Sequence, residues 1–256
     1  VTAGEKSFPL TPKAFAPAIV LAADDSGTIT PKADAKKLSA IVSAAAKKAG
    51  AEVVAKDAVV TFSGSTPTVT PDVPGVGLDD ASVQTEVWKA ITTPTRTATV
   101  TTKAVAPKFT TAIAKATLPK EKISSFTTYY PAGQPRVTNI KVASRVLNGT
   151  YIPPGEQFSM NAILGKRTPD KGYVKAGIIS GGRAASAYGG GISQVSTTIF
   201  NAAFFSGMEL DAWTPHYYYI SRYPEGREAT ISWPDLHNKF TNTTDGGVRM
   251  EVIATN

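Results

Sequence analysis

Apolar residues recur at helical spacing in the first half of the chain. Leu38, Ile41 and Val42 fall on one side of a helix with 3.6 residues per turn. Asp34 precedes them as a candidate N-cap, and Gly50 follows as a candidate helix end. The pattern predicts a helix between these two residues.

A different spacing follows this helix. Two β-branched runs, residues 58–62 and 66–70, lie on either side of Ser63-Gly64-Ser65. That segment has the length and the glycine of a hairpin loop. The remaining elements expected in this half are a linker that runs into an edge strand (residues 1–32, strand 18–22), a second helix capped by Asp79 or Asp80, and a threonine-rich strand at 95–105.

The second half reads mostly as short strands separated by glycine and proline turns. The expected strands include residues 209–213, 217–220, 228–233 and 248–253. One helix, from about Gln194 to Ser206, is apolar on nearly every face, which is typical of a buried element. The fold class is therefore α+β: a small α+β domain at 1–115, a linker at 116–122, and a β-rich domain with one central buried helix at 123–256.

Length and composition fit two globular domains. The 256 residues are 42% hydrophobic and 18% charged, and no apolar run reaches the ~18 residues that span a bilayer. The first residue is Val1, and no signal-peptide pattern precedes it. We expect a mature piece that lacks its export or anchoring segment.

Cysteine is absent, which excludes disulfides and thiolate catalysis, and only two histidines are present. We therefore expect no metal site and no cofactor. The net charge of +7 is spread along the chain: residues 1–120 carry 14 Lys/Arg against 10 Asp/Glu, and the rest carry 13 against 10. No basic block results, so nucleic acid is not an expected partner.

The strongest candidate for chemistry is the run Gly189-Gly190-Gly191 before the buried helix. Glycines at a helix start can aim backbone N–H groups at an anion, or they can form a tight turn with positive φ. The polar residues that follow, Ser193, Gln194, Ser196 and Thr197, are more than one N-cap requires. One hydroxyl is expected to cap the helix, and the others either satisfy buried backbone or contact a ligand.

The run from Tyr188 to Asn201 resembles the signature of the VanW family. The resemblance continues in residues 148–159, Gly172-Tyr173, Pro215-His216 and residues 226–230, and it covers about 121–256. The order of elements in the first half is similar to the peptidoglycan-binding domain that often precedes VanW domains. A spacer without wall binding is the alternative for that half.

The resemblance implies a cysteine nucleophile where this chain has Ser193, with His216 as its base. A serine hydroxyl is a far weaker nucleophile at neutral pH, and residues 191–195 do not fit the Gly-x-Ser-x-Gly elbow. Ser193 is thus a candidate nucleophile, a ligand contact or a helix cap. His216 is equally a candidate base or a structural residue.

Three further residues complete the predicted site. Tyr218 lies among three tyrosines with amphipathic faces, and Arg222 and Arg227 could hold a peptide carboxylate through paired hydrogen bonds. The alternative for the arginines is surface ion pairing with Glu225 or Glu228.

The resemblance leads to three functional hypotheses. The leading one is an extracytoplasmic protein, in the wall or anchored to a membrane, that binds peptidoglycan or its stem peptides without turnover. The second is an acyl-transfer enzyme of L,D-transpeptidase type, in which Ser193 attacks and the N–H groups near Gly190 and Gly191 hold the oxyanion. The third is a scaffold for a protein partner.

Overall fold

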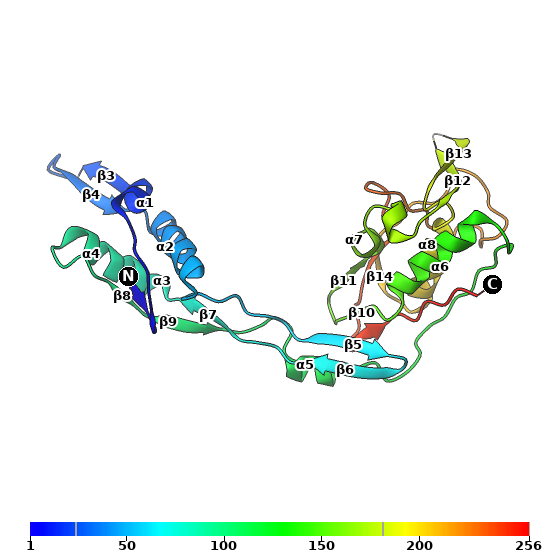
Figure 1. Ribbon diagram of the computed structural model, residues 1–256, viewed down its shortest axis with the longest axis horizontal. Coiled ribbons are helices and arrows are strands. Elements are labelled where there is room, and N and C mark those ends of the chain that lie inside the picture. Colours follow the sequence, from blue (N-terminus) through cyan, green and yellow to red (C-terminus); the bar gives the residue numbers. More distant parts are fainter. Residues whose placement is uncertain (24, 181, 256) are drawn as a thin grey trace. The chain divides into compact units, whose positions relative to one another are not determined.

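The computed structural model describes residues 1–23, 25–180 and 182–255. It divides into two compact units (Figure 1). The N-terminal unit comprises Val1–Val59 and Thr70–Thr111, and the C-terminal unit comprises Val60–Val69 and Ala112–Asn256. Both contain helices and strands, so the α+β fold class is confirmed.

Helix α2 organises the N-terminal unit. It spans Ala35–Ala49, the side chain of Asp34 accepts a hydrogen bond from the Lys37 N–H, and Gly50 ends it at φ 71°. Both predicted ends are confirmed. The buried face of α2 (Leu38, Val42, Ala46) joins the core of this unit.

The other elements of this unit are short. They are β1 (Thr2–Ala3), β2 (Lys6–Ser7), α1 (Pro12–Phe15), η1 (Ala16–Ala18), β3 (Ile19–Ala23), β4 (Ile29–Ala33), β7 (Gly75–Leu78), α3 (Asp80–Ser82), the π-helical η2 (Val83–Val87), α4 (Trp88–Thr92), β8 (Thr99–Val100) and β9 (Thr102–Val105). Strand β1 pairs with β2 and β8, β3 with β4, and β7 with β9. The linker expected at the N-terminus is wrong, because β1 pairs there and Ala3 and Phe8 are buried in the core.

The predicted hairpin is confirmed, but it belongs to the C-terminal unit. Strands β5 (Val59–Ser63) and β6 (Thr66–Thr70) form a two-stranded sheet. The Arg249 guanidinium lies 4.8 Å from the Phe62 ring centroid and donates to the Gly64 carbonyl at 2.6 Å. These contacts attach the hairpin to a unit whose other residues follow it by more than 40 positions.

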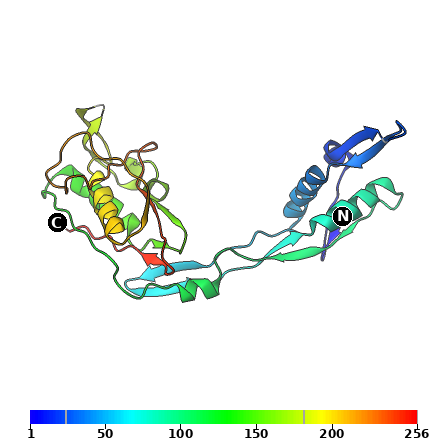
Figure 2. The same ribbon diagram turned by 180° about the vertical axis from the view of Figure 1, so that it is seen from behind.

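Two helices of equal length run through the C-terminal unit (Figure 2): α6 (Pro135–Leu147) and α8 (Ser193–Phe205). The other elements are α5 (Thr111–Ala116), β10 (Tyr151–Ile152), β11 (Gln157–Ser159), α7 (Met160–Leu164), η3 (Pro169–Lys171), β12 (Lys175–Ser180), β13 (Arg183–Tyr188), β14 (Glu209–Ala212), β15 (Lys239–Thr241) and β16 (Val248–Arg249). Strands β11, β15 and β14 form one sheet, β12 pairs with β13, and β10 with β16. Residues 217–220 form no strand and residues 228–233 only a single bridge at Ser232, against the sequence prediction.

Helix α6 was not foreseen, because polar residues interrupt its apolar pattern and its buried face includes Asn139 and Ser144. Asn139 is fully buried and bonded to backbone on three sides: Nδ2 donates to the Val174 and Gly190 carbonyls, and Oδ1 accepts from the Val174 N–H. A polar residue here replaces an apolar contact. It ties α6 to the glycine run.

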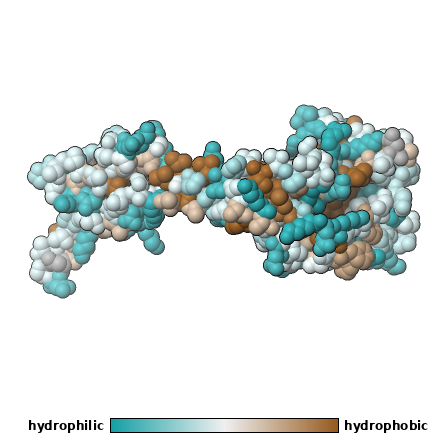
Figure 3. Space-filling model, turned by 90° about the horizontal axis from the view of Figure 1, so that it is seen from below, coloured by the Kyte–Doolittle hydropathy of each residue, from teal (hydrophilic) through white to brown (hydrophobic). Residues whose placement is uncertain are grey.

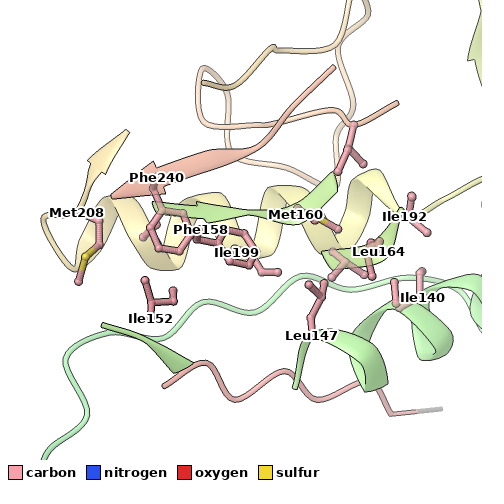
Figure 4. Close-up of a cluster of buried hydrophobic side chains, with 14 of the residues drawn as sticks. Ile140, Leu147, Ile152, Phe158, Met160, Leu164, Ile192, Ile199, Met208 and Phe240 are labelled. Carbon is pink, nitrogen blue, oxygen red and sulfur yellow. The ribbon is translucent and has the colours of Figure 1, made fainter. Parts of the chain in front are cut away.

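The core of this unit lies between α6, α8 and the β11–β15–β14 sheet. Figure 4 shows Phe158 and Phe240 of the sheet beside Ile199 of α8, with Leu147 and Ile140 of α6 below. The Phe158 and Phe240 rings stack with centroids 4.7 Å apart. On the face seen in Figure 3, apolar residues form separate patches among hydrophilic ones. No helix in the described parts of the chain is long and apolar enough to cross a bilayer.

Candidate functional site

A cavity of about 830 Å³ lies in the C-terminal unit. The β12–β13 hairpin, the glycine run with the start of α8, and residues 214–236 line it. Of the residues predicted for the site, those that line the cavity are Gly189, Gly191, Ser193, His216 and Arg222. Those that do not are Gly190, Gln194, Ser196, Thr197, Tyr218 and Arg227.

The glycine run is a tight turn that allows close packing. Gly189 and Gly191 have φ values of 81° and 92°, so the positive-φ interpretation holds. A Cβ on Gly190 would lie 2.3 Å from the Ala176 carbonyl oxygen, which leaves no space for a side chain. The Gly190 N–H donates to the Ala187 carbonyl at 3.2 Å. This N–H therefore serves the turn rather than an oxyanion.

Ser193 is the first residue of α8 and does not cap it. Ile192 occupies the N-cap position, and no side chain caps this helix. The capping prediction is thus wrong, because the helical backbone already begins at Ile192, one residue before Ser193. Ser193 Oγ lies 3.1 Å from Thr230 Oγ1 and accepts from the Ile231 N–H at 3.4 Å.

His216 is held by a carboxylate that sequence reasoning had treated only as a partner for surface arginines. Its Nδ1 lies 2.8 Å from Glu228 Oε2, and the two side chains are 9% and 13% exposed. The ring also stacks on Tyr223, at 5.6 Å between centroids. Burial raises the pKa of the Tyr223 hydroxyl, so it stays neutral at physiological pH.

The Glu228 carboxylate orients the imidazole through Nδ1, as for a general base, and no described residue forms a hydrogen bond with Nε2. No hydrogen bond joins Ser193 to His216 within the described residues, although both line one cavity.

The polar residues farther along α8 point into the fold. Gln194 Nε2 donates to the Tyr129 carbonyl, Asn238 donates to Ser196 Oγ, and Thr197 Oγ1 exchanges hydrogen bonds with the backbone of Ala229. All three α8 side chains are at most 2% exposed. They satisfy buried backbone and hold residues 223–238 on the helix, so we leave them out of the proposed site.

Tyr218 and Arg227 do not line the cavity, and each contacts another residue. The Tyr218 hydroxyl donates to the Gly182 carbonyl. The Arg227 guanidinium lies 4.8 Å from the Phe205 ring centroid, in a cation–π contact. Arg222 does line the cavity, where it is exposed and lies 5.6 Å from the Tyr223 ring centroid.

Three basic residues that sequence reasoning missed also line the cavity: Arg136, Lys166 and Arg167. With Arg222 they make four cationic side chains, and no Asp or Glu is among the described lining residues. Arg167 is 8% exposed, and burial lowers the pKa of its guanidinium below its ordinary value. An arginine side chain nevertheless remains charged in proteins. The cavity is suited to an anionic ligand. In the described part of the chain, no cluster of three His, Cys, Asp or Glu could hold a metal ion.

No local sequence signal marks these three basic residues. Arg136 stands alone, and Lys166-Arg167 is a basic pair of the kind that also occurs at residues 36–37 and 47–48. The glycines are an indirect signal for the two arginines. Gly189 and Gly191 lie against arginine side chains that come from the loop after α7 and from α6.

Comparisons with known proteins agree with this architecture. Residues 135–256 match the family described as "VanW like protein", and residues 15–98 match the family described as "Putative peptidoglycan binding domain". YoaR of Bacillus subtilis (strain 168), named as an uncharacterized protein, is 34% identical over 123 residues, which are 48% of this chain and 41% of YoaR. The vancomycin B-type resistance protein VanW of Enterococcus faecalis (strain ATCC 700802 / V583) is 31% identical over 119 residues, 43% of this chain and 42% of that protein.

The chain thus spans about two fifths of the length of these curated relatives. No solved structure shows a significant match. The glycine run, Ser193 and His216 all fall within the region matched to the VanW family. The peptidoglycan-binding region and the VanW-like region together support a cell-wall associated protein, in which residues 135–256 form a VanW-like domain whose homologues support the VanW family.

Proposed function

We propose that the cavity of the C-terminal unit binds peptidoglycan stem peptides, outside the cytoplasm, without forming a covalent intermediate. The observation that carries this proposal is the charge of the cavity: of the described residues that line its roughly 830 Å³, four are basic and none is acidic. Stem peptides end in a carboxylate and carry further carboxylates along their length. A cationic cavity of this size suits such a ligand.

The surroundings of Ser193 favour binding over turnover. A serine nucleophile needs a base within hydrogen-bond reach of its hydroxyl. Ser193 Oγ instead lies at 3.1 Å from a second hydroxyl, that of Thr230, which cannot accept its proton at neutral pH. The hydroxyl is therefore not activated in this arrangement.

Titration of defined tetrapeptide and pentapeptide muropeptides into the protein, followed by calorimetry, tests the proposal. We expect saturable binding that weakens by about 0.5 to 1 kcal/mol in Arg222→Ala, because exposed ion pairs contribute little. Arg227→Ala is the matched control, since Arg227 contacts Phe205 and does not line the cavity. Absence of saturation at millimolar peptide would refute the proposal.

One observation favours acyl transfer as a second candidate. His216 is oriented by Glu228 at 2.8 Å, which is how a carboxylate holds a general base. Ser193 and His216 line the same cavity, where a bound substrate would lie. This candidate requires a covalent adduct on Ser193, whereas binding does not.

A further inference from the structure

Two arginine side chains from elsewhere in the chain pack against the backbone of the glycine run. A Cβ on Gly189 would lie 2.6 Å from Arg167 Cγ and 2.9 Å from Arg167 Cβ. A Cβ on Gly191 would lie 2.6 Å from Arg136 Cβ. Distances below 3 Å exclude any side chain at either position unless the arginine moves. The two outer glycines therefore allow two cations to lie across the turn, beside the cavity that both arginines line.

Arg167 is buried with unused hydrogen-bond donors. Its residue is 8% exposed, and Nη1 donates to the Gly165 carbonyl at 2.7 Å. Nε and Nη2 are buried and have no acceptor within the described chain, and no described carboxylate forms an ion pair with Arg167. A buried charge without partners costs free energy, and a ligand carboxylate bound to these donors would offset that cost.

The two unused nitrogens share one edge of the guanidinium. Their N–H bonds are parallel, which matches the two oxygens of a carboxylate and permits a bidentate pair. A buried site strengthens this pair, because little water competes for either partner. Arg136 adds a second positive charge from the start of α6.

We propose that Arg167, whose side chain packs against Gly189, binds the C-terminal carboxylate of the peptide that enters the cavity. This inference rests on the proposed function and adds to it the part of the ligand that is recognised. It also assigns the first glycine of the run a specific role, which is to let the Arg167 stem cross the backbone. The ligand class is a short peptide with a free C-terminus.

A matched pair of ligands tests the inference. The probes are one synthetic stem pentapeptide with a free C-terminal carboxylate and the same peptide as its C-terminal amide. Every other carboxylate is present in both, so the pair isolates the terminal group. We expect the acid to bind the wild-type protein about ten- to a hundredfold more tightly, the range for hydrogen bonds to a charged group.

Arg167→Met removes the guanidinium and keeps an unbranched stem over Gly189. We expect this variant to bind acid and amide equally, at the affinity that the wild type has for the amide. The midpoint of thermal unfolding of the free variant should not fall, because an unpaired buried charge is lost with the hydrogen bond to Gly165. A purely structural arginine would instead lower the midpoint and leave the acid preference in place.

Gly189→Ala tests whether the packing of Arg167 against Gly189 is needed for carboxylate binding. Gly155→Ala is its control. Both glycines have positive φ, 81° and 75°, but a Cβ on Gly155 meets nothing within 4 Å. We expect only Gly189→Ala to lose the acid preference. Equal binding of acid and amide to the wild type would overturn the inference and leave the proposed function intact. Failure of both peptides to bind would overturn both.

Discussion

At the scale of single residues, the site depends on which partner each side chain has. Ser193 pairs with Thr230 and the Ile231 N–H, while His216 pairs with Glu228. Ser193, Thr230 and His216 line one cavity, and no hydrogen bond joins the two pairs within the described residues. The chemistry of the site therefore depends on whether the Ser193 hydroxyl changes its hydrogen-bond partner from Thr230 to the His216 imidazole.

Substitution of Ser193 separates binding from catalysis. We expect Ser193→Ala to keep stem-peptide affinity and to lose about 1 kcal/mol of unfolding free energy, because two hydrogen bonds to the loop disappear. Incubation of the wild type with stem tetrapeptide should give no adduct in intact-mass spectra. Ser193→Cys provides the positive control, since its thiol should be alkylated by iodoacetamide.

The contrary result for this residue would be a peptide adduct on the wild type that is absent in Ser193→Ala. His216→Ala should then lose as much activity as Ser193→Ala, because groups that act as a unit are not additive. Such data would establish acyl transfer in place of binding.

At the scale of elements, local capping defines α2, while tertiary packing defines α6 and α8. Asp34 accepts from the Lys37 N–H at 3.1 Å and caps α2. Neither α6 nor α8 has a side-chain cap. These two helices are held by burial and by the amides of Asn139 and Asn238, which bond to backbone.

The cap of α2 predicts a pH dependence. The hydrogen bond from the Lys37 backbone is the largest effect that lowers the Asp34 pKa below its ordinary 3.8. A carboxyl with a depressed folded pKa stabilises the fold above its unfolded pKa, and this stability is lost as pH falls through the folded pKa. Asp34→Ala should therefore lower the unfolding midpoint at pH 6 and have progressively less effect below about pH 4.

Chemical denaturation of both proteins between pH 2 and 6 measures this difference. Asp25→Ala is a suitable control, because Asp25 forms no helix cap and is exposed. A difference that stays constant across the range would mean that the charge of Asp34 does not contribute to the cap.

At the scale of the whole molecule, a residue's place in the sequence does not always decide which compact unit it belongs to. The β5–β6 hairpin lies in the sequence between two segments of the N-terminal unit, yet residues 60–69 belong to the C-terminal unit. Phe62 contacts Arg249, and its ring centroid lies 6.2 Å from that of Tyr151. The region matched to the peptidoglycan-binding family, residues 15–98, thus includes a segment that packs with the VanW-like region.

This membership predicts which unit responds to a change in the hairpin. Phe62→Ala should lower the stability of the C-terminal unit by about 1 to 2 kcal/mol, as expected for a half-buried aromatic ring. The N-terminal unit should be unaffected. Hydrogen exchange of core amides in each unit measures the two stabilities separately.

Phe8→Ala is the converse variant, since Phe8 is 5% exposed in the N-terminal core. It should speed exchange there and leave the C-terminal unit unchanged. A loss of protection in the N-terminal unit of Phe62→Ala would contradict the division into units.

The sequence alone determined the elements whose signals are local. Helix α2 has its apolar spacing, its aspartate cap and its terminal glycine within 17 consecutive residues, 34–50, and the β5–β6 hairpin has its loop between two β-branched runs. A tight turn with positive φ was one of the two interpretations that the glycine run allowed, and Gly189 and Gly191 have such φ values. Motif resemblance indicated the VanW-like domain, which residues 135–256 match, and it predicted one site for Ser193 and His216, both of which line the cavity.

Tertiary structure alone decided what these residues contact. Helix α6 buries an asparagine, so its pattern of apolar residues does not predict a helix. Only the folded chain shows that Glu228 forms a hydrogen bond with His216. The basic character of the cavity depends on Arg136 and Arg167, which lie 31 residues apart and meet the glycine run only after folding. Contacts between residues distant in sequence depend on packing and burial, and no local pattern encodes them.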